Sequence, residues 1–387
     1  MVAYTFYESD NRVRRYAESL VHRGARVDAI VLRRVGQSSF EVISGVNVHR
    51  LQSRVRDEQS PLAYLIKLLG FFLRSTWVIT RNHLKERYDI IHVHSVPDFQ
   101  VFSTIIPRLM GARIILDVHD IVPELYGSKF NVRESSLSFR ILLLIEKLSM
   151  AFADHVIIAN DLWYTKLTQR SVQAANCTVI INYPDPSIFS VRPSDAAPRS
   201  DFVLCYPGSL NWHQGVDLAI SAMALLRDRA PHIKFLIIGD GPERNKLKAT
   251  VKQQHLENHV KIVGSVPIEQ VAQIMSNVDL GVVPKRSDSF GNEAFSTKIM
   301  EFMAMGVPVL VSSTRIDRYY FNETLVQFFD PGNTEDLAAK ILELAHNAAK
   351  RSGFRNCGLK FIQQNNWDVK KGTYFSLIDQ LLKGRAP

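Results

Sequence analysis

The stretch 288–308, DSFGNEAFSTKIMEFMAMGVP, decides how the rest of the chain is interpreted. Ser296 and Thr297 are typical of a helix N-cap, and the Gly-Val-Pro that closes the stretch is typical of a helix end. The pattern therefore predicts a short helix over 297–305. Most of its residues are apolar and leave little surface for solvent, so we expect this helix to be largely buried.

Two glutamates flank the start of this predicted helix. Glu293 precedes the helix, and Glu301 lies within it, eight positions further on. Burying a carboxylate without a partner costs several kcal/mol, so we expect each glutamate to bind a partner group. Eight helical residues rise about 12 Å, which is too far for one shared proton or metal ion but close to the span of a nucleotide sugar. The helix start between them offers backbone N–H groups to an anion such as a diphosphate. The alternative is a core helix with one cap-stabilising acid and one buried ion pair.

Composition limits the classes of protein that the chain can belong to. The chain has 387 residues, 46% hydrophobic and 22% charged, which is typical of a globular protein with room for two domains. The net charge of +9 is diffuse, with +5 in residues 1–190 and +4 in the remainder. A nucleic-acid binder would more often gather its charge on one face, so we expect no nucleic-acid partner. A diffuse excess fits anionic substrates or an anionic membrane surface.

The cysteines and the apolar segments bear on the compartment. Cys177, Cys205 and Cys357 are too few and too widely spaced for a disulfide framework or a zinc site. The N-terminal stretch lacks the apolar core of a signal peptide, and no run of 18 uncharged apolar residues occurs. We therefore expect a cytoplasmic protein without a transmembrane helix.

The first half of the chain alternates short apolar runs with helical segments, beginning with a strand at 2–7 and a helix at 13–22. This alternation is typical of a doubly wound parallel sheet. Such sheets bind ligands at the carboxyl ends of their strands, which places Asp10 and Arg12 beside a ligand, on the acceptor side.

Histidines stand in two of the predicted strands of this half. His92 and His94 point to one face, because side chains along a strand repeat every two residues. A His-x-His pair can bind metal, but no cluster of further ligands is near in sequence, so we favour packed or cleft-edge histidines and predict no metal site. His119 and Asp120 follow another strand, where such a sheet meets its ligand. His119 can donate a hydrogen bond or carry charge near neutral pH there, or it can be structural.

Segment 61–85 is the most ambiguous part of the chain. Lys67, Arg74 and Arg81 recur every seven residues and form one basic stripe, with apolar residues on other faces. A basic amphipathic helix can lie on anionic lipid, which would make the protein peripheral on the cytoplasmic face of a membrane. A helix packed on the sheet with a solvated basic edge is the alternative. Further on, the loop at 122–130 is expected to form an acceptor-side lid.

Two domains are predicted. A segment rich in Pro, Asp and Ser at 182–201 is expected to link them, and the residues after it repeat the strand–helix alternation. We therefore predict an α/β fold of two Rossmann-like domains facing across a cleft, over 1–185 and 200–370. The final helix, at about 372–387, is expected to cross back onto the first domain.

The chain resembles glycosyltransferase family 4 in four stretches: the E-x7-E pair continued as EFMAMGVPV, FLIIGDGPERNKL at 235–247, VKIVGSVP at 260–267 and ILDVHDIVPELYGSKF at 115–130. Members of that family are retaining, metal-independent enzymes with two Rossmann-like domains, the GT-B fold. The resemblance covers most of the chain and is more specific in the second half. It implies transfer of a sugar from a nucleoside diphosphate sugar to a hydroxyl acceptor, with no cofactor, in the assembly of cell-surface polysaccharide or lipid-linked glycan.

The same resemblance implies a role for single residues. Glu301 would accept hydrogen bonds from the nucleotide ribose, Glu293 would face the hydroxyls of the donor sugar, and His119 would help to orient that sugar. The base would stack near Gly264. The backbone would approach the diphosphate at three residues, Ala294, Phe295 and Ser296.

The sequence departs from the family in YPGSLNWHQGVD, after the first strand of the second half. The family usually carries there an arginine and, about five residues on, a lysine, which neutralise the diphosphate. In this chain Ser209 and Gln214 stand at those places, beside Gly208. We expect another cation to substitute, first Lys298, because it lies in the first turn of the predicted helix. Two further candidates are Lys285 and Arg286.

Two other functions stay open on the sequence alone. A sugar-nucleotide epimerase with the GT-B fold needs the same donor site but no acceptor. A non-catalytic partner subunit of a glycosyltransferase would account for the missing arginine and lysine.

Overall fold

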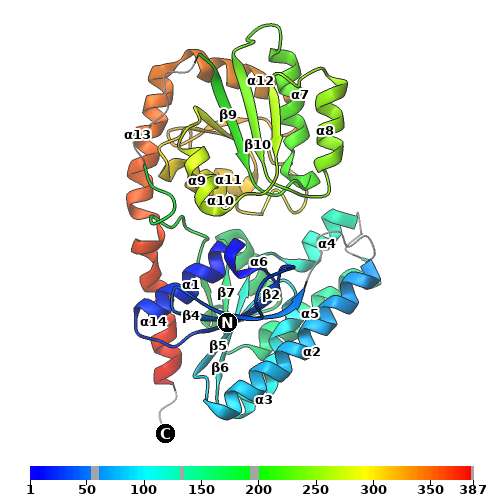
Figure 1. The fold of residues 1–387 in the computed structure, drawn as a ribbon, viewed down its shortest axis with the longest axis vertical. Coiled ribbons are helices and arrows are strands. Elements are labelled where there is room, and N and C mark those ends of the chain that lie inside the picture. Colours follow the sequence, from blue (N-terminus) through cyan, green and yellow to red (C-terminus); the bar gives the residue numbers. More distant parts are fainter. Residues whose placement is uncertain (54–60, 131–134, 192–199, 385–387) are drawn as a thin grey trace. The chain divides into compact units, whose positions relative to one another are not determined.

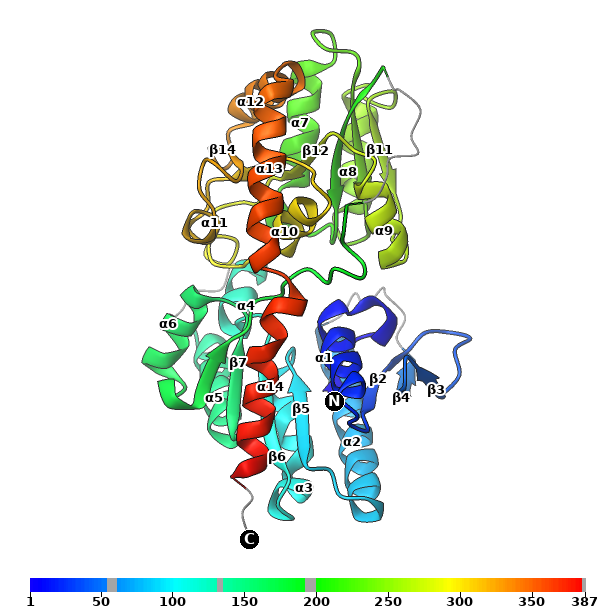
Figure 2. The same cartoon turned by 90° about the vertical axis from the view of Figure 1, so that its left-hand side faces the viewer.

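The computed structural model describes residues 1–53, 61–130, 135–191 and 200–384 of the chain (Figures 1 and 2). The chain divides into two compact units. The first unit is Met1–Asn182 with Thr373–Pro387, and the second is Tyr183–Gly372. The linker predicted at 182–201 lies partly outside the described residues.

The first unit is built on an eight-stranded sheet with the strand order β3-β4-β2-β1-β5-β6-β7-β8. All neighbouring strands are parallel except β3 and β4, which pair antiparallel. β1 is only two residues long, shorter than predicted. The strands are β1 (Val2–Ala3), β2 (Asp28–Arg33), β3 (Phe40–Ile43), β4 (Val46–Ser53), β5 (Ile90–His94), β6 (Arg113–Val118), β7 (His155–Ile158) and β8 (Cys177–Val179).

Helices connect these strands. α1 begins at Asn11 because the carboxylate of Asp10 accepts hydrogen bonds from the N–H groups of Arg12 and Val13, as an N-cap does. Segment 122–130, expected as a loop, is helical. The helices of this unit are α1 (Asn11–His22), α2 (Pro61–Lys85), α3 (Ile105–Leu109), α4 (Val122–Phe130), α5 (Leu137–Phe152) and α6 (Asp161–Arg170), with the 3-10 helices η1 (Tyr7–Ser9), η2 (Asp98–Thr104) and η3 (Ala174–Asn176).

α2 has the bounds of the segment 61–85 but is more apolar than the sequence analysis allowed for. Its part Ala63–Lys85 is long and apolar enough to cross a membrane by length and composition, with a mean hydropathy of 1.3 and 22% of the apolar window buried. The rule of 18 uncharged apolar residues missed it, because the helix tolerates a few basic residues within its apolar run. Leu68, Phe71 and Ile79 are buried, so one side of α2 belongs to the core of the first unit.

The second unit contains a six-stranded, all-parallel sheet with the order β11-β10-β9-β12-β13-β14. Its main core lies between the sheet and the helices α7, α8 and α12. The strands are β9 (Phe202–Pro207), β10 (Ile233–Ile238), β11 (Val260–Val263), β12 (Leu280–Val283), β13 (Val309–Ser312) and β14 (Gln327–Phe329). The helices are α7 (Val216–Leu226), α8 (Arg244–Gln253), α9 (Ile268–Met275), α10 (Thr297–Ala304), α11 (Arg315–Tyr320), α12 (Thr334–His346) and α13 (Ala348–Gln364), with η4 (Trp212–Gln214).

The last helix, α14 (Trp367–Lys383), begins in the second unit, and most of it belongs to the first. The ring of Tyr374 packs on that of Tyr16 in α1, with centroids 4.3 Å apart. Its hydroxyl lies 3.0 Å from Nδ1 of His92 in β5. These contacts hold the C-terminal helix on the first unit.

α10 is the helix predicted over 297–305. It ends at Ala304 with Met305 as the C-cap, and Gly306 has a φ of +70°, the left-handed conformation that suits glycine after a helix. Ser296 stands at the N-cap position, but its hydroxyl makes no capping hydrogen bond. The start and stop residues of the sequence therefore predicted the position of the helix. The capping hydrogen bond expected from the Ser296 side chain is not formed.

Candidate active site

The carboxyl end of β9 meets the first turn of α10 at Gly208. A Cβ atom on Gly208 would lie 2.3 Å from Cε and 3.0 Å from Nζ of Lys298, so the glycine makes room for the lysine. The Nζ atom lies 3.5 Å from Oε1 of Gln214 and 5.3 Å from the centroid of the Tyr206 ring. Lys298 therefore lies close to Ser209 and Gln214, the two positions where the family usually carries an arginine and a lysine.

Tyr206 fixes the loop that carries these positions. Its hydroxyl lies 2.9 Å from the backbone oxygen of Ser209 and 3.0 Å from Oε1 of Gln214. The side chain is fully buried, so this hydroxyl has protein partners in place of water. The sequence analysis did not identify Tyr206 as a site residue, because an aromatic residue in a buried strand is ordinarily a core residue.

Glycines let the neighbouring loops approach closely. A Cβ on Gly239 would lie 1.8 Å from the backbone oxygen of Gly208, and one on Gly215 would lie 1.9 Å from that of Pro284. Both glycines have positive φ angles. No larger residue could hold the loops after β9, β10 and β12 this close together.

The other two candidate cations have structural partners instead. Nζ of Lys285 lies 2.9 Å from Oδ2 of Asp317 and donates to the backbone oxygen of Ala294 at 2.7 Å, and both charged side chains are buried. Arg286 forms two hydrogen bonds with Asp217, at 2.6 and 2.8 Å. The expectation that either could replace the missing pair is therefore corrected. Lys285 holds in place the loop that precedes α10.

The two glutamates differ in their surroundings. Glu293 is mostly buried in the loop before α10, with Oε1 3.5 Å from Nη1 of Arg315. Glu301 is half-buried on α10, one turn after Lys298. The ring of Phe295 packs edge-on against Tyr320, with centroids 4.9 Å apart.

The start of α10 carries a buried hydroxyl that has no hydrogen-bond partner among the described residues, Oγ of Ser296. A buried polar atom without a partner is unfavourable, and a bound group can supply the missing hydrogen bond. Together with the N–H groups of the first helical turn and the ammonium group of Lys298, this hydroxyl makes a region suited to an anion.

Burial shifts two pKa values in this region. It lowers the pKa of Lys298 to about 8, although the nearby Glu301 carboxylate acts in the opposite direction. It also lowers the pKa of His213 to about 4, with Asp288 opposing the shift. His213 is therefore neutral at neutral pH. The sequence analysis missed it, although its place just after a strand, in the segment NWHQG, was a usable signal.

Gly264 follows the carboxyl end of β11, at the same edge of the second sheet as Gly208 and Gly239. The nearest atom to a Cβ placed there is Nη2 of Arg244, 3.6 Å away. This edge of the second unit thus collects most of the residues that were predicted to bind the donor, and their roles stay predictions.

In the first unit, His119 lies just after β6. Its Nε2 atom is 3.2 Å from Oδ2 of Asp117 and 3.1 Å from Nδ1 of His94. Arg12 donates two hydrogen bonds of 2.8 Å to the same carboxylate. Burial alone would raise the pKa of Asp117, but Arg12 and then His119 hold it well below its usual range. The carboxylate therefore orients the ring of His119.

The acceptor-side predictions divide into two groups. Arg12 is buried and paired with Asp117, and Asp10 caps α1, so both have roles in the fold of the first unit, and their place beside an acceptor stays a prediction. Asp120 and His119 are half-buried at the carboxyl end of β6. Burial raises the pKa of Asp120, with His119 opposing.

His92, His94 and Asp117 lie close enough together to hold a metal ion, with ligand atoms within 4.8 Å of one another. The two histidine rings stack with centroids 4.2 Å apart, as their shared face predicts. However, Arg12 donates hydrogen bonds to both carboxylate oxygens of Asp117, and Nδ1 of His92 lies within hydrogen-bond distance of the Tyr374 hydroxyl. The cluster is thus a buried charge network of the first unit.

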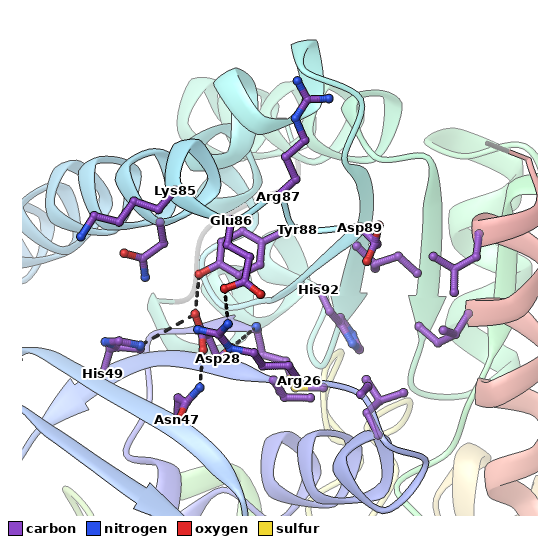
Figure 3. A pocket seen from close by; sticks show the side chains of 18 of the residues that line it. Arg26, Asp28, Asn47, His49, Lys85, Glu86, Arg87, Tyr88, Asp89 and His92 are labelled. Atoms are coloured by element: carbon purple, nitrogen blue, oxygen red, sulfur yellow. Dashed lines mark hydrogen bonds and ion pairs between the residues drawn. The ribbon is translucent and has the colours of Figure 1, made fainter. Parts of the chain in front are cut away.

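A cavity of about 590 Å³ lies at the opposite, amino-terminal edge of the first sheet (Figure 3). It lies where β2 and β5 run past the start of β1. Asp28 in its wall accepts hydrogen bonds from Asn47 at 2.9 Å and from Tyr88 at 2.6 Å. Because it opens at the edge away from His119, we do not include it in the candidate site.

Comparisons with known proteins agree with this geometry. The family model "Glycosyl transferase 4-like domain" matches residues 9–182, and "Glycosyl transferases group 1" matches residues 188–361. A putative colanic acid biosynthesis glycosyltransferase, WcaL of Escherichia coli, is 27% identical over 158 residues, which are 41% of this chain and 39% of that protein. The matches to this and two further curated relatives span 39 to 48% of their lengths.

Solved structures show the same fold. Sucrose-phosphate synthase from Thermosynechococcus elongatus superposes with a TM-score of 0.79 at 20% identity and covers 99% of both chains. Anabaena HepE in complex with UDP-glucose superposes with a TM-score of 0.73 at 17% identity over 98% of both chains. The chain has the GT-B fold and belongs to the family 4 type of glycosyltransferases.

Proposed function

We propose that this chain transfers a sugar from a nucleoside diphosphate sugar to a hydroxyl group, with retention at the anomeric carbon and without a metal ion. Membership of a glycosyltransferase family supports the class of reaction. The UDP-glucose bound by HepE supports a nucleotide-sugar donor. The proposed acceptor is a glycan or a lipid-linked glycan of cell-surface polysaccharide assembly, in line with the colanic acid pathway of the E. coli relative.

The observation that carries the proposal is the position of Lys298. Its ammonium group lies beside Gly208 and Gln214, at the start of α10, where the unpartnered hydroxyl of Ser296 is also buried. A cation, a hydroxyl and a helix N-terminus in one place suit a diphosphate. Lys298 would replace the arginine and lysine that the sequence lacks.

In the proposed reaction the bond between the anomeric carbon and the diphosphate oxygen breaks, and the acceptor oxygen forms the new bond on the same face of the sugar. The acceptor proton passes to an oxygen of the leaving diphosphate. The negative charge that develops on this leaving group would be stabilised by Lys298 and by the N–H groups of α10. Glu301 would hold the ribose, and Glu293 would hold the donor sugar.

His119 is proposed to orient the donor sugar, since Asp117 and His94 fix its Nε2 edge. The helix at 61–85 is proposed to bring the enzyme to an anionic membrane surface on the cytoplasmic side, where a lipid-linked acceptor would be presented. The basic residues of that helix and the net charge of +9 support this location.

A thermal-shift panel of nucleoside diphosphates and their sugars tests the donor, because a ligand that binds only the folded protein raises its melting temperature. The responding donor is then incubated with candidate acceptors, with and without EDTA, and the product's anomeric configuration is read by NMR. Transfer with retention in EDTA is expected. An isomerised sugar formed from the donor alone would identify an epimerase, and binding without turnover would favour a partner subunit.

A further inference from the structure

α2 exposes a stripe of large apolar side chains along one side. The exposed positions follow each other mostly at intervals of three, four or seven residues, which keeps them on one helical face. Leu73 and Trp77 near its middle are 66% and 62% exposed. The stripe consists of Leu65, Ile66, Leu69, Leu73, Trp77 and Leu84.

Two more helices of the first unit carry similar stripes. Leu109 on α3 is 82% exposed and Leu137 on α5 is 74% exposed. The remaining exposed apolar residues of these helices are Ile105, Ile106, Ile141, Leu144 and Leu148. We call the thirteen residues on the three helices the apolar face. Scattered exposed leucines are ordinary, but more than half of the large apolar side chains exposed in the described part of the chain lie on this face.

The three helices form one layer on one side of the first sheet. η2 contacts both α2 and α5, and α3 continues directly from it. Phe99 in η2 packs against Phe72 of α2, and Phe102 packs against Phe152 of α5. Because the buried sides of these helices face the unit's interior, their exposed stripes point away from it together.

The exposed charges on these three helices have one sign. The charged side chains that α2, α3 and α5 expose or half-expose are all basic: Lys67, Arg74, Arg81, Lys85, Arg108, Arg140 and Lys147. The single acidic residue within these helices is Glu146, which is buried and pairs with Arg170 at 2.6 Å. Arg81 lies over the Trp77 ring, 5.2 Å from its centroid, next to the stripe of α2.

We propose that the apolar face, and not α2 alone, docks the protein onto an anionic phospholipid bilayer, with the three helices lying in the plane of the interface. Apolar side chains on helices whose exposed charges are all basic complement acyl chains below anionic headgroups. A second copy of this chain would fit less well, because it would bring two basic rims together.

Crossing the bilayer is disfavoured by the contacts of α2 on its inner side. Phe71 is fully buried in the unit. Ser75, buried as well, accepts a hydrogen bond of 2.7 Å from Gln100, and Arg74 donates one of 2.9 Å to Gln52. A spanning α2 would leave this core and carry Arg74 toward the bilayer centre, where charged residues are costly.

The proposal rests on the membrane location given in the proposed function and deepens it by naming the docking surface. Vesicle co-sedimentation of the full chain tests this surface and needs no sugar transfer. Vesicles of phosphatidylcholine mixed with phosphatidylglycerol are compared with phosphatidylcholine alone. We expect binding to the mixed vesicles, and a loss of about tenfold or more for Leu73→Glu/Trp77→Glu on α2 and, separately, for Leu144→Glu/Leu148→Glu on α5. Leu225→Glu is the matched control, since Leu225 is an exposed leucine of α7 in the second unit. It should bind like the unaltered protein.

Three results would overturn the proposal. Normal binding of the α5 variant would confine docking to α2. Resistance of the bound protein to alkaline carbonate would indicate a spanning helix. A dimer in solution that the α2 variant dissociates, without vesicle binding by the unaltered protein, would make the face an interface between copies. The thermal shift with nucleoside diphosphates, measured on each variant, shows that it is folded and reports a failure of the donor proposal separately.

Discussion

The ammonium group of Lys298 lies 3.5 Å from the side-chain oxygen of Gln214, the residue that stands where a cation was expected. If Lys298 contacts the diphosphate, Lys298→Met removes a charge-assisted hydrogen bond, which contributes about 1.5–3 kcal/mol. We expect nucleoside diphosphate affinity, measured by calorimetry, to fall by about 10- to 150-fold. Lys246→Met, which removes an exposed lysine of α8, is the control and should bind normally. Unchanged affinity in Lys298→Met would show that the diphosphate binds elsewhere.

The lowered pKa of Lys298 predicts a pH dependence of donor binding. Burial brings this pKa to about 8, so the free protein loses the ammonium charge as the pH rises through 8. A bound diphosphate favours the charged form, and binding then takes up a proton. Above pH 8 the affinity for a nucleoside diphosphate should therefore fall, approaching about one log unit per pH unit. Calorimetry in buffers from neutral to alkaline pH measures the slope, and Lys298→Met should show a flat profile over the same range.

Glu301 and Lys298 should affect different parts of the donor. Glu301→Ala is expected to weaken nucleotide binding by about 1–3 kcal/mol if the carboxylate accepts hydrogen bonds from the ribose. A nucleoside without phosphates should suffer the same loss, because it retains the ribose. Lys298→Met, in contrast, should leave nucleoside binding unchanged. Equal loss of nucleoside and diphosphate binding in both variants would argue against separate ribose and diphosphate contacts.

The buried pair of Lys285 and Asp317 should contribute to stability. Lys285→Met leaves the Asp317 carboxylate buried without its cation, which costs about 3–5 kcal/mol. We expect the urea midpoint of the second unit to fall markedly, whereas Lys285→Met/Asp317→Leu, which removes both charges, should recover most of the loss. A single variant as stable as the unaltered protein would return Lys285 to the list of candidate donor contacts.

The sequence predicts the features of this site that depend on neighbouring residues. It does not predict contacts between residues that are far apart in the chain. Ser296, Gly306 and Pro308 mark the ends of α10, because helix starts and stops follow from nearby residues. The sequence ranks Lys298 before Lys285 and Arg286, but it cannot give the partner of Lys285, since Asp317 lies further along the chain in α11. Only packing shows that one is close to Gly208 and that the others are paired.

Arg12 illustrates the same limit in the first unit. It follows the first strand, where an acceptor-facing residue was expected, but it pairs with Asp117, which is 105 positions away. The alternation of apolar runs predicted the sheet and therefore the edge at which His119 lies. It could not predict that Asp117, within β6, gathers Arg12 and His119 around one carboxylate.

Substitutions of Asp117 and His119 should have different effects, the first on stability and the second on turnover. The pKa of Asp117 is held well below its usual range, so its contribution is complete above pH 4 or so and is lost as the pH falls through the folded-state value. Asp117→Asn should lower stability at neutral pH by about 3–5 kcal/mol, because Arg12 remains buried without its anion. The difference from the unaltered protein should shrink in acid, as unfolding monitored by circular dichroism at several pH values would show.

His119→Ala, in contrast, removes a half-buried ring at the edge of this network and leaves the pair of Arg12 and Asp117 intact. We expect nearly normal stability, an unchanged thermal shift with nucleoside diphosphate and a lower kcat with the nucleotide sugar, since the ring is proposed to orient the sugar and not the nucleotide. His22→Ala, which removes a histidine at the end of α1, is the control and should keep normal turnover. A His119→Ala variant with unchanged kcat would assign the ring to the fold of the first unit alone.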